Sequence, residues 1–221
     1  MRNRLGRTAA FPALLLLVGG LAWAAYPRHP SLTAFDADRM AEADVAMWRD
    51  YYDKRYFSLF ARLYALHRDE FGFSPFDSLR IAFDAADAAR RFQPTKSREE
   101  ANSAIPALVG YYSLLAKAAP ARFDPAEAAR LELDWWQARR ENIGPDAYGL
   151  TIARISSLLY GVDAPRLSDA GVARARAMAY RDAHGEAMSE ADWRALADQL
   201  RAAYRGLKAG TVSAEGRTTP P

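Results

Sequence analysis

The sequence predicts an all-α fold, with one helical-bundle domain of about seven helices over residues 36–209. Apolar residues recur at steps of three and four through most of this range, which is the period of one helix face. Cap residues, often followed by Pro, begin the periodic segments, and Gly or Pro ends them. No run alternates apolar and polar residues beside hairpin turns, so the sequence predicts no sheet.

The longest predicted helix covers residues 36–71, a range without Pro or Gly. At about 1.5 Å per residue it would extend roughly 50 Å, which exceeds the width of a small domain. We therefore expect the other helices to be organised on it. Its predicted inner face consists of apolar residues at helical spacing: Val45, Trp48, Tyr52, Tyr56, Leu59, Leu63 and Leu66.

Six shorter helices are expected after the long one. Their predicted ranges are 75–92, 97–118, 124–142, 146–160, 168–184 and 189–210. Pro106 lies within the second of these and predicts a kink or a split, because proline lacks a backbone N–H donor. Residues 210–221 carry few apolar side chains, and we expect them to form a disordered tail.

Residues 1–26 are typical of a transmembrane anchor or a signal peptide. Three arginines within the first seven residues precede an uncharged, mostly apolar run over residues 9–26. Ala22-Trp23-Ala24 matches a signal-peptidase site, whereas the length of the run favours an uncleaved single-pass anchor. Both interpretations place the domain outside the cytoplasm. The anchor leaves the N-terminus inside, whereas cleavage near Ala24 gives a secreted or periplasmic domain. A third interpretation is an N-terminal core helix of a soluble protein.

Residues 27–35 contain Pro27 and Pro30, which favour extended backbone. We expect this stretch to be a short, stiff linker between the membrane segment and the domain.

Composition excludes several classes of function. The net charge is +3, but residues 1–30 contribute four arginines and no acid, so the rest of the chain has 26 basic and 27 acidic residues. No clustered basic face stands out, and nucleic acid is not an expected partner. Cysteine is absent, which excludes disulfides, thiol nucleophiles and cysteine-ligated metals.

No motif of a known catalytic chemistry occurs. None of the three histidines, His29, His67 and His184, follows a Glu by three residues, so the E-x-x-H pattern of di-iron bundles is missing. The H-E-x-x-H, P-loop, G-x-G-x-x-G, G-x-S-x-G and S-x-x-K patterns are missing too. We predict no catalytic residue, metal ligand or cofactor. His67 and Glu70 are interpreted as a surface pair near a helix end.

One candidate binding site combines residues of the first helix with residues of the helix over 124–142. The residues at matching spacing are Trp48, Tyr52, Arg55, Glu132, Trp135 and Arg139. If the two faces meet, they could form a pocket for an anionic or aromatic small molecule, with arginine as the clamp. The interpretation that this spacing favours is an aromatic core with a buried ion pair and cation–π contacts. A cavity of several hundred Å³ would favour the pocket, and a filled junction would favour the core.

The sequence supports two hypotheses for function. The first is a membrane-tethered, extracytoplasmic helical domain that acts as a protein-interaction or assembly factor. The second is a helical small-molecule binder or enzyme that uses the Glu132/Arg139/Arg55 site.

Overall fold

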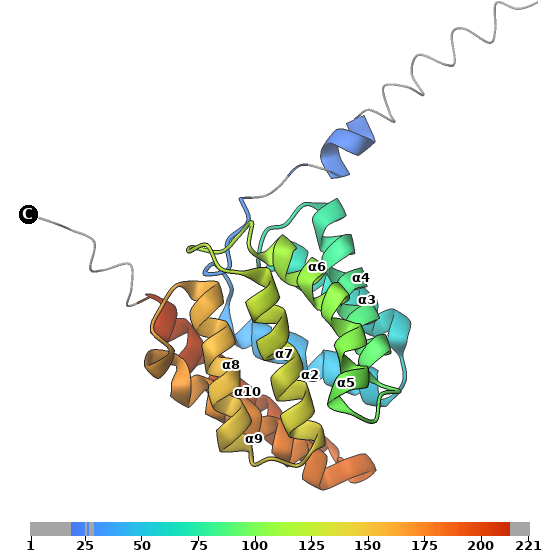
Figure 1. Ribbon diagram of the computed structural model, residues 1–221, viewed down its shortest axis with the longest axis vertical. Helices are drawn as coiled ribbons and strands as arrows, with labels where there is room; N and C mark the ends of the chain where they lie inside the picture. Colours follow the sequence, from blue (N-terminus) through green and yellow to red (C-terminus); the bar gives the residue numbers. More distant parts are fainter. Residues whose placement is uncertain (1–18, 25, 27–28, 213–221) are drawn as a thin grey trace, which may run out of the picture.

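The computed structural model describes residues 19–24, 26 and 29–212. This part of the chain is all-helical, and it contains no strand. The helices are α2 (Ala37–Tyr52), α3 (Tyr56–Asp69), α4 (Pro75–Phe92), α5 (Arg98–Ala101), α6 (Ile105–Leu115), α7 (Pro125–Arg140), α8 (Pro145–Tyr160), α9 (Ser168–His184) and α10 (Glu190–Val212), as Figure 1 shows.

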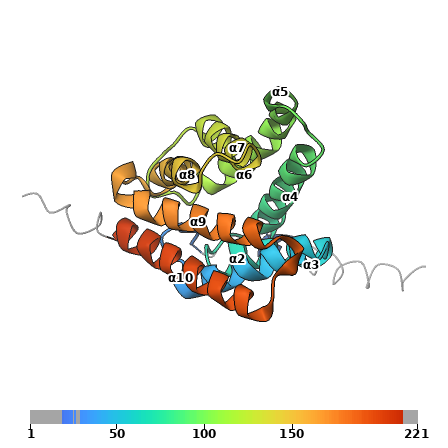
Figure 2. The same cartoon turned by 90° about the horizontal axis from the view of Figure 1, so that it is seen from below.

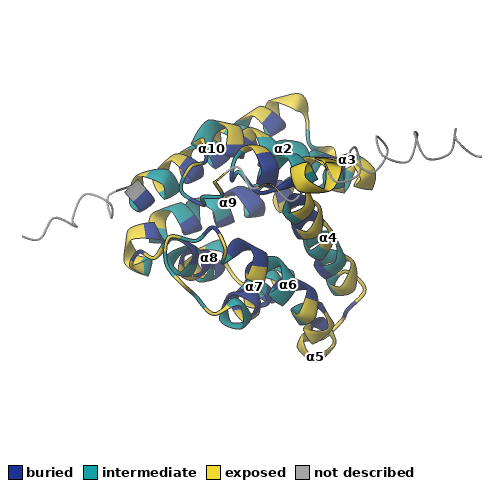
Figure 3. Cartoon of the chain, turned by 90° about the horizontal axis from the view of Figure 1, so that it is seen from above, coloured by how far each residue is buried: buried dark blue, intermediate teal, exposed yellow. Residues whose placement is uncertain are grey.

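The longer helices form a closed ring. Each packs against the next one along the chain, from α2 through α3, α4, α6, α7, α8 and α9 to α10, and α10 packs back against α2. Figures 2 and 3 view this arrangement from the two ends, and the labels follow one another around it. The short connections between helices favour such packing between neighbours in sequence. The ring positions the apolar faces of all its members toward one interior.

The predicted long helix over residues 36–71 is wrong, because the chain breaks between α2 and α3. Lys54 adopts a left-handed conformation, with φ of 59°. The turn brings the guanidinium of Arg55 to 2.9 Å and that of Arg62 to 2.7 Å from the carboxylate of Asp50, which is buried. These two ion pairs compensate the Asp50 charge. Burial alone would raise the pKa of Asp50, but hydrogen bonds to its carboxylate are among the interactions that hold this pKa below the usual value. No Pro or Gly marks this break in the sequence.

The predicted interruption at Pro106 is confirmed. The segment divides into α5, a 3-10 turn over Asn102–Ala104, and α6, with Pro106 in the first turn of α6. Proline fits there because the first N–H groups of a helix have no intrahelical partner. The predicted caps also form: the hydroxyl of Ser74 accepts from the N–H of Asp77, and the carboxylate of Asp124 accepts from the N–H of Ala126.

Residues 31–35 belong to the domain, which corrects the predicted linker over 27–35. Leu32 and Phe35 are fully buried in the core. The N–H of Ser31 donates to the carbonyl of Phe71, and that of Leu32 donates to the carbonyl of Ala118. The two prolines do favour extended backbone, but an extended segment with two large apolar side chains gains by burying them.

The C-terminal boundary also lies later than predicted. Helix α10 continues to Val212, and Thr211 is buried. A Cβ on Gly210 would lie 2.4 Å from a methyl carbon of Leu167, so this turn of α10 sits tightly on the neighbouring segment. The rest of the predicted tail, residues 213–221, lies outside the described residues.

Most of the predicted membrane segment, residues 1–26, lies outside the described part of the chain as well. Residues 19–24 are helical. Among the described residues, no helix combines the length and the apolar character needed to cross a membrane.

Candidate functional site

Two adjacent cavities lie inside the helix ring. The outer cavity has a volume of about 630 Å³, and the inner cavity has a volume of about 330 Å³. They share part of their walls, formed by Asp44, Met47, Leu63, Trp135 and Trp136. A ring of helices leaves an axial space that side chains must fill, and here they fill it only in part.

The outer cavity contains four of the six predicted site residues. Trp48 and Tyr52 come from α2, and Trp135 and Arg139 come from α7. Helix α2 packs against α3 and α10, whereas α7 packs against α6 and α8. The two predicted faces therefore meet across a cavity. Exposed residues mark its opening to solvent: Gln93, Asn142 and Asp182.

Arg139 is held in place by two partners at this opening. Its guanidinium donates to both carboxylate oxygens of Asp182, at 2.7 and 2.8 Å, and to the hydroxyl of Tyr52 at 3.1 Å. Burial opposes the charge of Arg139, but these two partners outweigh it and raise its pKa above the usual value. The ring of Tyr52 also lies against the buried guanidinium of Arg181, whose Cζ is 3.2 Å from the ring centroid.

Arg55 and Glu132 lie elsewhere. Arg55 lines neither cavity and is half-exposed on the outside of the ring, where it pairs with Asp50 and Asp53. Glu132 lines the inner cavity, and it accepts hydrogen bonds from the hydroxyl of Tyr112 at 2.8 Å and from the indole N–H of Trp136 at 2.9 Å. The predicted constellation of Glu132, Arg139 and Arg55 is thus not brought together in one place.

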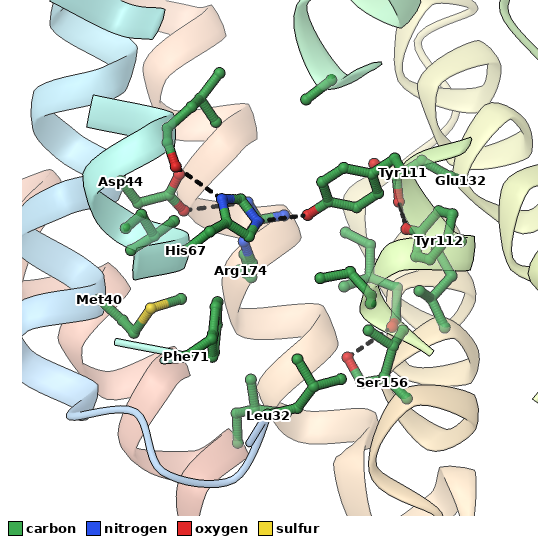
Figure 4. A pocket seen from close by; sticks show the side chains of 18 of the residues that line it. Leu32, Met40, Asp44, His67, Phe71, Tyr111, Tyr112, Glu132, Ser156 and Arg174 are labelled. Carbon is green, nitrogen blue, oxygen red and sulfur yellow. Dashed lines mark hydrogen bonds and ion pairs between the residues drawn. The ribbon is translucent and has the colours of Figure 1, made fainter. Parts of the chain in front are cut away.

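The inner cavity receives side chains from all eight helices of the ring. Figure 4 shows it from close by, with polar groups from several elements pointing toward its centre. Most of its lining is aliphatic or aromatic. The aliphatic members are Leu32, Met40, Met47, Leu63, Leu66, Ala85, Leu108, Leu115, Ile152, Ile155, Leu159 and Leu207.

A buried ion pair crosses the inner cavity wall between α2 and α9. The guanidinium of Arg174 lies 3.1 Å from a carboxylate oxygen of Asp44, and the hydroxyl of Tyr204 donates to the same oxygen at 2.7 Å. Burial raises the pKa of Tyr204, and the neighbouring Asp44 carboxylate raises it further. Asp44 and Arg174 thereby bind α2 to α9, and Tyr204 adds α10 to the same network.

His67 is buried in the inner wall, which corrects the predicted surface pair with Glu70. Its Nδ1 lies 2.7 Å from the carbonyl of Leu63 and its Nε2 lies 3.4 Å from the hydroxyl of Tyr111. Burial lowers the pKa of His67 to about 4, so the imidazole is neutral at physiological pH, with Nδ1 as the donor to Leu63. Glu70 instead accepts hydrogen bonds from Arg39 and from the N–H of Asp36.

The sequence contains partial indications that Asp44 and His67 are buried, although neither was predicted to line a site. Asp44 interrupts the apolar spacing of Met40 and Met47 on α2, and an acid at such a position must face the interior. His67 lies four residues after Leu63 on the apolar face of α3, which equally indicates burial. Nothing in the sequence connects Asp44 with Arg174, because their pairing depends on how α2 and α9 meet.

No protein-family model matches this sequence, and neither curated proteins nor solved structures gave a match. The conclusions about function therefore rest on the cavities themselves. In the described part of the chain, no group of three or more acidic or histidine side chains is arranged to hold a metal ion.

Proposed function

We propose that this protein binds a small, largely apolar molecule inside its helix ring. The observation that supports the proposal most is the outer cavity of about 630 Å³, which four of the predicted site residues line. This volume falls within the range of about 300–1,000 Å³ that is typical of ligand sites. Six aromatic side chains supply much of the wall: Trp48, Tyr51, Tyr52, Phe92, Trp135 and Trp136.

The inner cavity of about 330 Å³ also favours an apolar ligand, because most of its wall is apolar. Water gains few hydrogen bonds against an apolar wall. An apolar occupant would remove these aliphatic and aromatic side chains from water, and this hydrophobic burial favours binding.

The polar groups of the outer cavity lie near its opening, which suits a ligand with one polar end. The guanidinium of Arg139 and the amide groups of Gln93 and Asn142 can contact that end, while the indoles of Trp135 and Trp136 contact the apolar part. The absence of a recognisable nucleophile–base arrangement among the described residues near this cavity favours a binder, such as a carrier or a receptor subunit, over an enzyme.

The proposal is tested by titrating the full chain with a panel of aromatic, acyl and amphipathic compounds. Bound compounds should raise the melting temperature and change tryptophan emission. Trp135→Phe should remove much of the emission change, whereas Trp193→Phe, which replaces an indole outside both cavities, should preserve it. Arg139→Ala should abolish ligand-induced stabilisation with little loss of fold. If every compound leaves both the melting temperature and the emission unchanged, the proposal is wrong.

A second candidate function is a protein-interaction or assembly role, and an exposed apolar stripe favours it. Phe76, Leu79 and Phe83 follow one another along α4 with exposed fractions of 55%, 48% and 63%. Such clusters are often interaction surfaces. A photo-crosslinker at position 83 should yield a discrete adduct in the native host if this role holds. The same crosslinker at Leu150, exposed to a similar degree on α8, is the matched control.

We also retain the predicted location as a proposal: residues 1–26 tether the domain to a membrane, or direct it across one and are then removed. The basic start and the uncharged run over residues 9–26 support it. Cell fractionation with intact-mass measurement of the mature chain distinguishes the two forms. Recovery of the full-length chain, including Met1, from the cytosol would contradict both.

A further inference from the structure

We infer that the ligand is a single-chain amphiphile, whose hydrocarbon chain enters the inner cavity and whose anionic head group stays at the opening of the outer cavity. This inference rests on the proposed function and specifies its ligand. It follows from three features of the two cavities: the chemistry of the inner wall, the side chains between the cavities, and the charges at the opening.

The inner wall offers an apolar surface although it contains charged residues. Asp44 and Arg174 neutralise each other, and Tyr204 bonds to both. Glu132 accepts two hydrogen bonds, from Tyr112 and Trp136. These groups are already engaged within the protein, so a polar ligand group would have to displace an existing partner. The aliphatic side chains around them favour a methylene chain instead.

The side chains between the cavities can admit a narrow chain. Met47 and Leu63 line both cavities, together with Asp44 and the two tryptophans of α7. Methionine is unbranched and has three rotatable side-chain bonds, so it moves aside at little cost. A flat fused-ring ligand would need a wider passage. A linear chain can therefore extend from the outer cavity into the inner cavity, which a compact ligand would leave vacant.

The charges at the opening favour an anion. Arg139 and Arg140 both line the outer cavity. Asp182 pairs with Arg139, whereas Arg140 donates only to uncharged groups, those of Thr95 and Gln137. The remaining acid of this cavity, Asp44, is paired with Arg174. Arg139, Arg140 and Asp182 together therefore leave one net positive charge at the opening. Arginine is well suited to bind a carboxylate or a phosphate group in a bidentate manner. Asp182 occupies Arg139 in the ligand-free protein, and an anionic head group would share or replace that contact.

Chain length is the first test. Calorimetric titration of the full chain with straight-chain carboxylates, from hexanoate to hexadecanoate below their micelle concentrations, should give affinities that rise with length. Ala85 lines the inner cavity on α4 and Ala89, one turn later, lines only the outer cavity. Ala85→Phe should remove the advantage of the longer chains and leave hexanoate unaffected. The milder Ala85→Leu should shorten the preferred chain if the Phe variant does not fold.

The head group is the second test. Dodecanoate and dodecyl phosphate should bind more tightly than dodecylamine. Asp182→Asn removes the competing carboxylate, and it should strengthen binding of the two anions by about two- to fivefold, the effect of one partly exposed charge. The two anions distinguish a carboxylate source from a phosphate source. Asp146→Asn, which removes an exposed carboxylate on α8 outside both cavities, is the control.

The possible outcomes separate this inference from the proposed function. If compact aromatic compounds bind and chain length has no effect in either the natural protein or Ala85→Phe, the chain is not in the inner cavity and the inference fails, while the proposed function stands. Preference for the amine over both anions also overturns it. If no compound of any class binds, the proposed function fails together with the inference.

Discussion

Asp44 and Arg174, which are 130 positions apart in the sequence, lie 3.1 Å apart at their charged atoms in the wall of the inner cavity. The hydroxyl of Tyr204 completes the group by donating to Asp44. One buried network thus joins α2, α9 and α10. It lies where α10 packs against α2 and closes the helix ring.

This ion pair predicts a characteristic pattern of stabilities. Asp44→Leu leaves the Arg174 charge without its partner and should cost about 3–5 kcal/mol of unfolding free energy. The double variant Asp44→Leu/Arg174→Met replaces both charges by apolar groups and should recover most of that loss. Denaturant unfolding measures both. The exposed pair Arg176–Asp146 is the control, since Asp146→Ala should leave the unfolding free energy nearly unchanged. A double variant as unstable as Asp44→Leu alone, or less stable, would contradict the account.

Lys54 distinguishes the observed break from the uninterrupted helix that the sequence predicts. At φ of 59°, a side chain strains the backbone by roughly 1–2 kcal/mol, which glycine avoids. Lys54→Gly should therefore raise the stability by about 1 kcal/mol. In a continuous helix the same change would lower it by about 1 kcal/mol, because glycine is a poor helix former. Lys54→Ala keeps the Cβ, so it should leave the stability nearly unchanged at the observed break, whereas in a continuous helix it would raise the stability slightly. Thermal unfolding of both variants distinguishes the two cases.

The packing of α8 on α9 depends on two facing glycines. A Cβ on Gly171 would lie 2.4 Å from the carbonyl oxygen of Gly149, and one on Gly149 would lie 2.6 Å from the Cα of Val172. Backbone atoms cannot move aside as a side chain can, so Gly171→Ala should cost about 2 kcal/mol or more. Gly206→Ala in α10 is the matched control. Its new methyl would make an ordinary contact with Ala170, and the better helix propensity should stabilise the protein by about 0.5–1 kcal/mol.

His67 should make stability depend on pH between about 4 and 6.5. Burial lowers its pKa to about 4 in the folded protein, whereas the unfolded chain takes up the proton near the ordinary value of 6.5. The unfolded state therefore binds more protons in this window, and stability falls as the pH falls from 6.5 to 4. The full difference corresponds to about 3 kcal/mol.

The measurement is urea unfolding across this range for the natural protein and for His67→Gln. The pH-dependent loss should be smaller in His67→Gln by about the amount given above. An identical pH profile for the natural protein and His67→Gln would show that His67 is not buried in its neutral form.

Much of the fold could be predicted from the sequence because helix ends are encoded locally. Ser74, Asp124 and Gly161 mark boundaries that a cap or a left-handed residue must satisfy, and each boundary is where the pattern placed it. The break at Lys54 was missed because its cause is not local to that residue. It depends on Asp50 receiving Arg55 and Arg62 from the following segment, and no breaker residue accompanies it.

The candidate site was predictable only in part for a similar reason. Helical spacing predicts Trp48 and Tyr52 on one face and Trp135 and Arg139 on another, and all four residues line the outer cavity. Spacing alone does not determine how far two helices lie apart, so it could not tell a filled junction from a cavity. It also placed Arg55 on a face that the break at Lys54 turns outward.

The most direct test of the ligand-binding proposal is to fill the outer cavity and to measure stability and binding in the same variant. Ala89 lines this cavity on α4, and Ala89→Phe should add apolar contacts there. The account predicts a higher melting temperature without ligand and loss of ligand binding at the same time. Ala88→Phe is the control, because it overfills the packed core beside the cavity and should lower the melting temperature. An Ala89→Phe protein that melts lower than the natural one, or that still binds ligand with undiminished affinity, would contradict the claim.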